Sequence, residues 1–260
     1  MGCQDMKIKL NKDKNIGKVL FIVEGSKTEF YLLSKIFNKV FDYQYETIKR
    51  ALPYEKYNAK INPLSRVFVI NTENSNIKSI DKDNKFLDKL FEELIINYDF
   101  SIDNAAIYYI FDRDHQSNND VRFIENMLGL LKNSRDNEGF ERQGLLLLSY
   151  PSLESFTFSN FVNDSFDNCI ENGNKLKEYL NNLNINQSKI NEKTLMFSVN
   201  ELIKSLRKMD IFSYDLDDFG NTNKEVFIKQ EEFFKLNNEY RILSLLSIAL
   251  LDLGLITIEE

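Results

Sequence analysis

Four short apolar runs recur in the first part of the chain, and stretches with helical spacing separate them. The runs are 18–23 (KVLFIV), 66–71 (RVFVIN), 105–111 (AAIYYIF) and 145–151 (LLLLSYP). Runs of this length that are rich in apolar residues are typical of strands covered on both faces. Because parallel strands need a crossover connection, usually a helix, the alternation predicts an α/β fold with a parallel sheet flanked by helices.

The stretches between the runs repeat apolar residues at steps of three and four. They predict helices over 27–41, 84–97 and 120–132. The inner face of the first helix is formed by Phe30, Leu33, Phe37 and Val40. Residues 42–65 have no clear period and contain two of the three prolines. We therefore expect an irregular connection there.

Strand patterns vanish from Leu153 onward. The remaining apolar periodicity predicts helices over 153–164, 174–183, 195–209, 224–236 and 239–253. The sequence thus predicts two domains, a catalytic α/β domain over 1–165 and a helical C-terminal module over 166–260. The apolar segment LSLLSIALLDLGL at 243–255 suggests a helix buried within the module or an interface. The C-terminal helices could form a homodimer, contact a partner or clamp the substrate.

Residue counts exclude several kinds of chemistry. His115 is the single histidine, and Cys3 and Cys169 lie far apart, so zinc clusters and disulfide scaffolds are ruled out. The net charge is −7, although the N-terminal third is basic and could face phosphates. No apolar stretch reaches the roughly 18 residues of a membrane span. We expect a soluble, cytoplasmic protein without a membrane segment, whose chemistry depends on carboxylates.

Acidic residues follow three of the four predicted strands. Glu24 comes after the first strand, Asp112 and Asp114 after the third, and Glu154 just after the fourth. In a parallel sheet the carboxyl ends of the strands meet at one edge, where ligands bind. Clustered carboxylates without histidine suit a hard cation such as Mg²⁺ or Mn²⁺. The pattern therefore predicts a metal site, provided that the strand order brings these ends together.

Gly25 and Glu29 extend this pattern into the first helix. Gly25 would allow a sharp turn of the backbone directly after Glu24. Glu29 lies in the first turn of the predicted helix. Its negative charge either stabilises the helix by interacting with the positive end of the helix dipole, or binds a second metal ion.

Three motifs resemble those of Toprim domains. VLFIVEG at 19–25 is similar to the first Toprim motif, and YYIFDRD at 108–114 is similar to its Asp-x-Asp motif. EGSKTEFY at 24–31 resembles a signature of RloB-like and OLD-type nucleases, with Tyr31 one residue early. YPSLESFTFSNF at 150–161 resembles a later RloB-like segment, with Asn160 in place of its histidine. The resemblance covers residues 18–162.

The resemblance implies a Toprim-like catalytic domain in a divalent-metal-dependent endonuclease that cleaves DNA or RNA, tRNA included. Glu24, Asp112 and Asp114 would be catalytic, and the metal ligands would be Glu24, Glu29, Asp112, Asp114 and Glu154. Lys27, Arg113 and His115 are candidates for contacts with phosphate. Proteins of this kind often act in antiphage defence beside a separate ATPase, and this chain has no phosphate-binding loop of its own.

Two other functions fit the same residues. A non-enzymatic subunit could use this edge of the sheet to bind nucleic acid or an ATPase partner. A small-substrate phosphatase would use Asp112 as nucleophile and Asp114 as general acid, but Glu24-Gly25 gives that idea no support. A topoisomerase or primase would need further domains. The choice between DNA and RNA stays open, because no base-reading module is evident.

Overall fold

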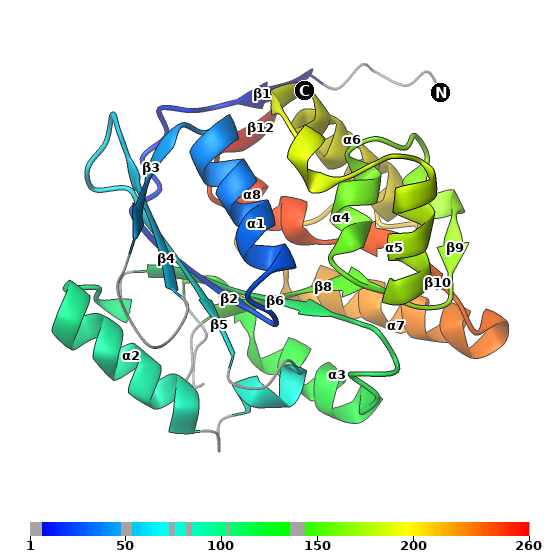
Figure 1. Ribbon diagram of the computed structural model, residues 1–260. Coiled ribbons are helices and arrows are strands. Elements are labelled where there is room, and N and C mark those ends of the chain that lie inside the picture. The colour runs from blue at the N-terminus through cyan, green and yellow to red at the C-terminus, as the bar shows by residue number, and fades with distance from the viewer. Residues whose placement is uncertain are drawn as a thin grey trace.

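A mixed sheet with helices on both faces forms the centre of the computed structural model, which describes residues 7–47, 54–72, 76–81, 85–102, 105–135 and 144–259 (Figure 1). Within these ranges the sheet has eight strands. Their order is β11 (Leu243–Ser244), β8 (Gly144–Tyr150), β6 (Ala105–Asp112), β2 (Lys18–Val23), β5 (Arg66–Asn71), β4 (Tyr54–Ala59) and β3 (Tyr43–Thr47), with β7 (Lys132–Asn133) paired to β8. The predicted α/β class is confirmed.

The four predicted parallel strands are β2, β5, β6 and β8, and they lie side by side in the middle of the sheet. Nearly every residue in them is buried, since helices cover both faces. In the register, Val23 at the end of β2 pairs with Asn71 on one side and Ile110 on the other. The carboxyl ends of β2, β5 and β6 therefore lie at the same edge.

A hairpin of β3 and β4 occupies the segment predicted to be irregular, so that prediction is wrong. β4 pairs antiparallel with both β3 and β5 and extends the sheet outward. The rings of Tyr43 and Tyr57 pack on Phe37, at centroid distances of 5.7 and 6.0 Å. Contacts with the helix that precedes them, rather than a regular alternation of apolar residues, thus hold these strands in place.

The three predicted helices of this part are present with small shifts at their ends. They are α1 (Thr28–Ser34), which continues as the π-helix η1 (Lys35–Val40), α2 (Lys85–Tyr98) and α3 (Val121–Leu130), and a short 3₁₀ helix, η2 (Ile77–Ile80), precedes α2. The predicted inner face of the first helix is buried. Position 84, where the second helix was predicted to begin, lies outside the described residues. Figure 1 shows α1 on one face of the sheet and α2 and α3 on the other.

The C-terminal part contains five α-helices within the described residues. They are α4 (Glu154–Ser159), α5 (Gly173–Asn182), α6 (Glu192–Lys208), α7 (Gly220–Asn237) and α8 (Leu246–Asp252), with the 3₁₀ helices η4 (Ser165–Asp167) and η5 (Gln187–Lys189) between them. Four of the five predicted helices correspond to α4 to α7. The predicted helix over 239–253 is wrong in its first half, where two short strands lie and α8 begins only at Leu246.

Short strands also occur after Leu153, where none were predicted. β9 (Cys169–Ile170) pairs with β10 (Tyr240–Arg241), and β12 (Ile256–Glu259) pairs with β1 (Lys7–Leu10). β11 pairs antiparallel with β8, whose edge it covers. Strands of two to four residues are too short for a periodic pattern to show in the sequence.

One large hydrophobic core crosses the predicted domain boundary. Its buried side chains run from Val19 on β2 to Ile256 on β12, and a small second cluster contains Phe158, Leu176, Leu180 and Ile242. The C-terminal part therefore packs on the sheet and shares its core. Within the described residues, no helix is both long and apolar enough to cross a membrane.

Candidate functional site

The strand order places the predicted site where the chain changes direction across the sheet. From β2 the chain passes through α1 to β5 on one side, and it later returns through α2 to β6 on the other side of β2. The helices that follow β2 and β6, α1 and α3, therefore lie on opposite faces of the sheet (Figure 1). In α/β proteins, ligands bind at the carboxyl ends of the strands at such a switch point. Glu24 and Asp112 lie at these two neighbouring strand ends.

Hydrogen bonds join the two strand ends directly. The backbone N–H of Asp112 donates to Glu24 Oε2 at 2.9 Å, and the N–H of Leu153 donates to Asp112 Oδ1 at 2.8 Å. The second bond draws the segment after β8 to the same point. Asp112 is thus held between the loops that follow β2 and β8.

Glu154 enters the site in the first turn of α4. It is 7% exposed, and Ser152 Oγ donates to its Oε2 at 2.8 Å. Lys177 from α5 lies 3.4 Å from its Oε1. Sequence reasoning did not find Lys177, because only packing brings α5 to this edge of the sheet.

Glu29 reaches the site because Gly25 has no side chain. A Cβ at position 25 would lie 2.9 Å from Glu29 Oε2, closer than carbon and oxygen approach without a shift. Gly25 does not have a positive φ. The glycine instead leaves room for the Glu29 carboxylate to fold back over the loop.

Burial and mutual repulsion raise the pKa values of three of these carboxyl groups. Burial raises the pKa of Glu24 to about 7, and the charges of Glu29 and Asp114 add to the rise. Burial, with the charges of Glu24, Glu154 and Glu29, raises the pKa of Asp112 well above its usual range. The pKa of Glu29 is raised by burial, with the charge of Glu154 adding to it. Four carboxylates therefore share one poorly solvated region.

Asp114 stands at the side of this group. Its Oδ1 accepts from the N–H of Gln116 at 2.9 Å, and its Oδ2 accepts from the N–H of Gly173 at 3.0 Å. Both oxygens therefore bind backbone groups, one of them at the start of α5. Asp114 is close enough to raise the pKa of Glu24 through its charge, but it is tied to its own loop and to α5.

The three predicted phosphate contacts have different positions. Lys27 and His115 are exposed, and the His115 ring stacks on Phe234 of α7 with 4.9 Å between centroids. Arg113 is fully buried, and its guanidinium donates to the carbonyl of Asn118 and to Glu231 Oε2. That position does not fit the predicted contact with phosphate, so we do not include Arg113 among the substrate contacts.

Asn118 is a second residue that sequence reasoning missed. It is 3% exposed; its Nδ2 donates to the carbonyl of Asp112 at 2.7 Å, and its Oδ1 accepts from the N–H of Ile77 at 2.9 Å. Its side chain also hydrogen bonds to Glu24, which lowers the pKa of that carboxyl against the effect of burial. Its place six residues after Asp112, in the same loop, is the signal that could have pointed to it.

The donor set suits Mg²⁺ or Mn²⁺ in its chemistry, since every candidate ligand is a carboxylate oxygen. As the side chains stand, no group of three or more His, Cys, Asp or Glu in the described ranges is arranged to hold a metal ion. Mg²⁺ commonly binds through one or two carboxylates and keeps several waters, so three direct ligands are not required. The residues therefore fit such an ion in the chemical type of their ligand atoms.

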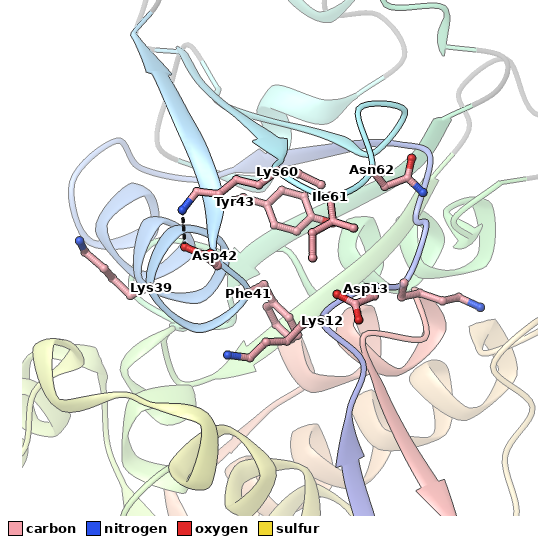
Figure 2. A pocket seen from close by; sticks show the side chains of 11 residues that line it. Lys12, Asp13, Lys39, Phe41, Asp42, Tyr43, Lys60, Ile61 and Asn62 are labelled. Atoms are coloured by element: carbon pink, nitrogen blue, oxygen red, sulfur yellow. Dashed lines mark hydrogen bonds and ion pairs between the residues drawn. The ribbon is translucent and has the colours of Figure 1, made fainter.

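A pocket lies at the opposite edge of the sheet. It has a volume of about 250 Å³ and is lined by segments that precede β2 and β5, with Lys12, Lys39 and Lys60 among its residues (Figure 2). Figure 2 shows that these ammonium groups point in different directions, and Lys60 is paired with Asp42. The pocket therefore has no convergent group of charges, and the carboxylate group remains the candidate functional site.

Comparison of the chain with protein-family models, with curated proteins and with solved structures gave no match.

Proposed function

We propose that this protein is a Toprim-like, divalent-metal-dependent endonuclease that cleaves the phosphodiester bonds of DNA or RNA. One observation carries the proposal: Glu24, Glu29, Asp112 and Glu154 converge at the switch point of a parallel sheet, where burial and the neighbouring negative charges raise the pKa values of Glu24, Glu29 and Asp112. Such a group is unstable as a set of bare charges, because like charges in a poorly solvated region repel. A bound Mg²⁺ or Mn²⁺ removes that repulsion.

The carboxylates would divide the work according to their positions. Bound metal would bind a phosphate oxygen, favour deprotonation of water and stabilise the leaving oxyanion. Asp112 and Glu154 would bind the metal ion from the side of β6 and β8. Glu29 would bind it from the side of α1, and Asp114 lies at the edge of the carboxylate group. Glu24, with its pKa of about 7, can also accept or release a proton near neutral pH, as a general acid or base requires.

Substrate contacts and cellular setting complete the proposal. The exposed Lys27 and His115 flank the strand ends that carry Glu24 and Asp112, where they can meet a phosphate backbone. By its resemblance to RloB-like and OLD-type nucleases, the protein would act in the cytoplasm as an effector of antiphage defence, with a separate ATPase. Its C-terminal helices could pair two copies as a homodimer.

The experiment is cleavage of plasmid DNA and of total tRNA by the full chain with Mg²⁺ or Mn²⁺. Wild type is compared with the double variant Glu24→Ala, Asp112→Ala, and the matched control is Asp164→Asn, which removes a carboxylate outside the site. Cleavage by wild type and the control but not by the double variant supports the nuclease and identifies its substrate class.

Other outcomes point to the remaining functions. Metal binding without cleavage of either substrate would favour a subunit that binds nucleic acid or an ATPase partner. Loss of phosphate from a small ester, with a phosphorylated Asp112 trapped on the protein, would favour the phosphatase.

A further inference from the structure

The side chain between the two aspartates points away from the predicted metal site. Consecutive residues at the end of a strand alternate in direction, so Arg113 faces the opposite way from its neighbours Asp112 and Asp114. Its side chain is fully buried. A buried cation is costly unless it is paired and hydrogen bonded, so the partners of Arg113 must be held firmly.

Those partners belong to the C-terminal part of the chain. Arg113 Nη2 lies 2.8 Å from Oε2 of Glu231 on α7, which is 5% exposed. The guanidinium carbon lies 5.7 Å from the ring centroids of both Phe227 and Tyr240, and the Tyr240 hydroxyl donates to Glu231 Oε1 at 3.4 Å. The residue next to Asp112 is thus enclosed by α7 and β10.

The same guanidinium closes the loop that carries the aspartates. Arg113 Nη1 donates to the carbonyl of Asn118 at 2.6 Å, and Asn118 Nδ2 donates to the carbonyl of Asp112 at 2.7 Å. Since the Asn118 side chain also contacts the Glu24 carboxylate, a shift of Arg113 would be passed to that carboxylate and to the backbone of Asp112. Two further contacts tie this loop to the C-terminal part, the stacking of His115 on Phe234 and the bond from Gly173 to Asp114.

We infer that Arg113 and Glu231 are positioning residues through which α7 sets the geometry of the carboxylates at the ends of β2 and β6. The inference rests on the proposed function for its effect on metal binding, but its effect on the loop is independent of metal. It also gives the C-terminal part a role, because a displacement of α7 would loosen the loop between Asp112 and Asn118.

The first test measures amide hydrogen exchange by NMR in the metal-free protein. The amides of Asp112, Leu153 and Gly173 each donate to a carboxylate of the site. In the Glu231→Gln variant these three amides should exchange on the order of 10-fold faster than in wild type. This increase should be larger than the change at core amides such as that of Ile22. If the three amides change no more than the core does, the inference is wrong, whatever the protein's activity.

A matched control separates positioning from the loss of any buried charge. Asp252 pairs with Arg135 at 2.8 Å and accepts from Tyr108, four residues before Asp112 on β6. Asp252→Asn therefore removes the charge of a buried carboxylate on α8 that contacts β6 away from the loop. The three amides should keep their protection relative to the core in this variant.

A second variant keeps the test decisive if Glu231→Gln folds poorly. Replacing both partners with methionine (Arg113→Met, Glu231→Met) leaves no unpaired buried charge, and such replacements are often tolerated. If positioning depends on the bond from Arg113 to Asn118, the folded double variant should still lose amide protection and bind Mn²⁺ about 10-fold more weakly. Wild-type protection and Mn²⁺ affinity in this variant would overturn the inference.

Failure of the proposed function gives a different result. If wild type binds no Mn²⁺ and cleaves no nucleic acid, the proposed function is wrong. The exchange rates of the three amides still decide the positioning role of Arg113 and Glu231.

Discussion

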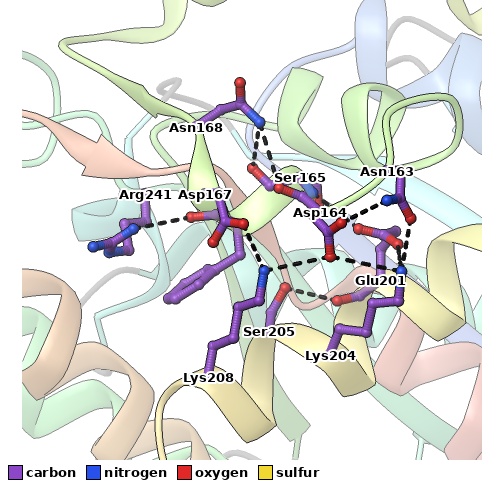
Figure 3. A network of polar contacts seen from close by, with 11 residues as sticks. Asn163, Asp164, Ser165, Asp167, Asn168, Glu201, Lys204, Ser205, Lys208 and Arg241 are labelled. Carbon is purple, nitrogen blue, oxygen red and sulfur yellow. Dashed lines mark hydrogen bonds and ion pairs between the residues drawn. The ribbon is translucent and has the colours of Figure 1, made fainter. Parts of the chain in front are cut away.

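Two acidic groups in this protein differ in how their charges are balanced. The first is the carboxylate group at the sheet edge, made of Glu24, Glu29, Asp112 and Glu154. The second lies between η4 and α6 and contains Asp164, Asp167 and Glu201 (Figure 3). In the second group Lys204 and Lys208 lie between the carboxylates, at distances of 2.7 to 3.7 Å.

The difference shows up in the titration of the two groups. Hydrogen bonds to Glu201 and Asp167 raise the pKa values of Lys204 and Lys208, so these lysines hold their charge firmly. At the sheet edge, Lys177 lies 3.4 Å from Glu154, and three of the carboxyl groups have raised pKa values. In the second group two lysines offset most of the charge of three carboxylates, whereas at the sheet edge one lysine faces four carboxyl groups. The larger excess of negative charge at the sheet edge is what the proposed metal ion would offset.

Removing a carboxylate should affect activity only in the unbalanced group. We expect Asp112→Asn to reduce cleavage at least on the order of 100-fold, because it removes a proposed metal ligand held at the centre of the site. Asp164→Asn should stay near the wild-type rate. Both variants are tested by their rates of plasmid and tRNA cleavage at saturating Mn²⁺. Equal losses of activity in the two variants would contradict the proposed difference between the two acidic groups.

The stability of the metal-free protein should fall as the pH rises through about 7. The folded pKa of Glu24 is raised above its usual value, so the protonated form favours the fold at low pH and this contribution is lost as the pH rises through the folded pKa. We expect the melting temperature to drop on the order of 5 °C between pH 5 and 8.

Calorimetry with and without Mg²⁺ measures this pH effect. Mg²⁺ should restore much of the lost stability at pH 8, and Glu24→Gln should flatten the pH dependence. A melting temperature that rises steadily over this range in the metal-free protein would contradict the assignment of excess charge to the site.

A methyl group at position 25 should disturb the site without unfolding the protein. Gly25→Ala places a Cβ 2.9 Å from Glu29 Oε2 and should displace that carboxylate, weakening Mn²⁺ binding about 10-fold. The control is Gly129→Ala on α3, where nothing lies within 4 Å of the added atom. That variant should be neutral or stabilised by up to about 1 kcal/mol, as titration calorimetry and thermal unfolding would reveal.

Breaking the balanced group should have the smallest effect. Lys208 lies near the surface, and its pairs with Asp164 and Asp167 are partly exposed to solvent. We expect Lys208→Met to change the free energy of unfolding by about 0.5 kcal/mol and the cleavage rate not at all. Urea unfolding at low and high salt measures this, and a loss of several kcal/mol would show that the second group is not merely a surface network.

Local patterns in the sequence predicted the centre of the fold well and its margins poorly. The runs that became β2, β5, β6 and β8 are buried on both faces, so their composition alone marks them as strands. β3 and β4 depend on contacts with Phe37, which a periodic pattern within the strands does not show. β9, β10 and β11 are each two residues long, which is too short for a periodic pattern to predict a strand.

The sequence by itself determined which chemical groups stand at the strand ends: Glu24, Asp112 and Glu154, with Gly25 and Glu29 close behind. Only the tertiary structure decided that β2 lies beside β6, that Arg113 is buried against Glu231, and that Lys177 and Gly173 reach the site. The physical reason is that strand formation follows from local burial patterns, whereas strand order and helix packing follow from contacts between residues far apart in the chain.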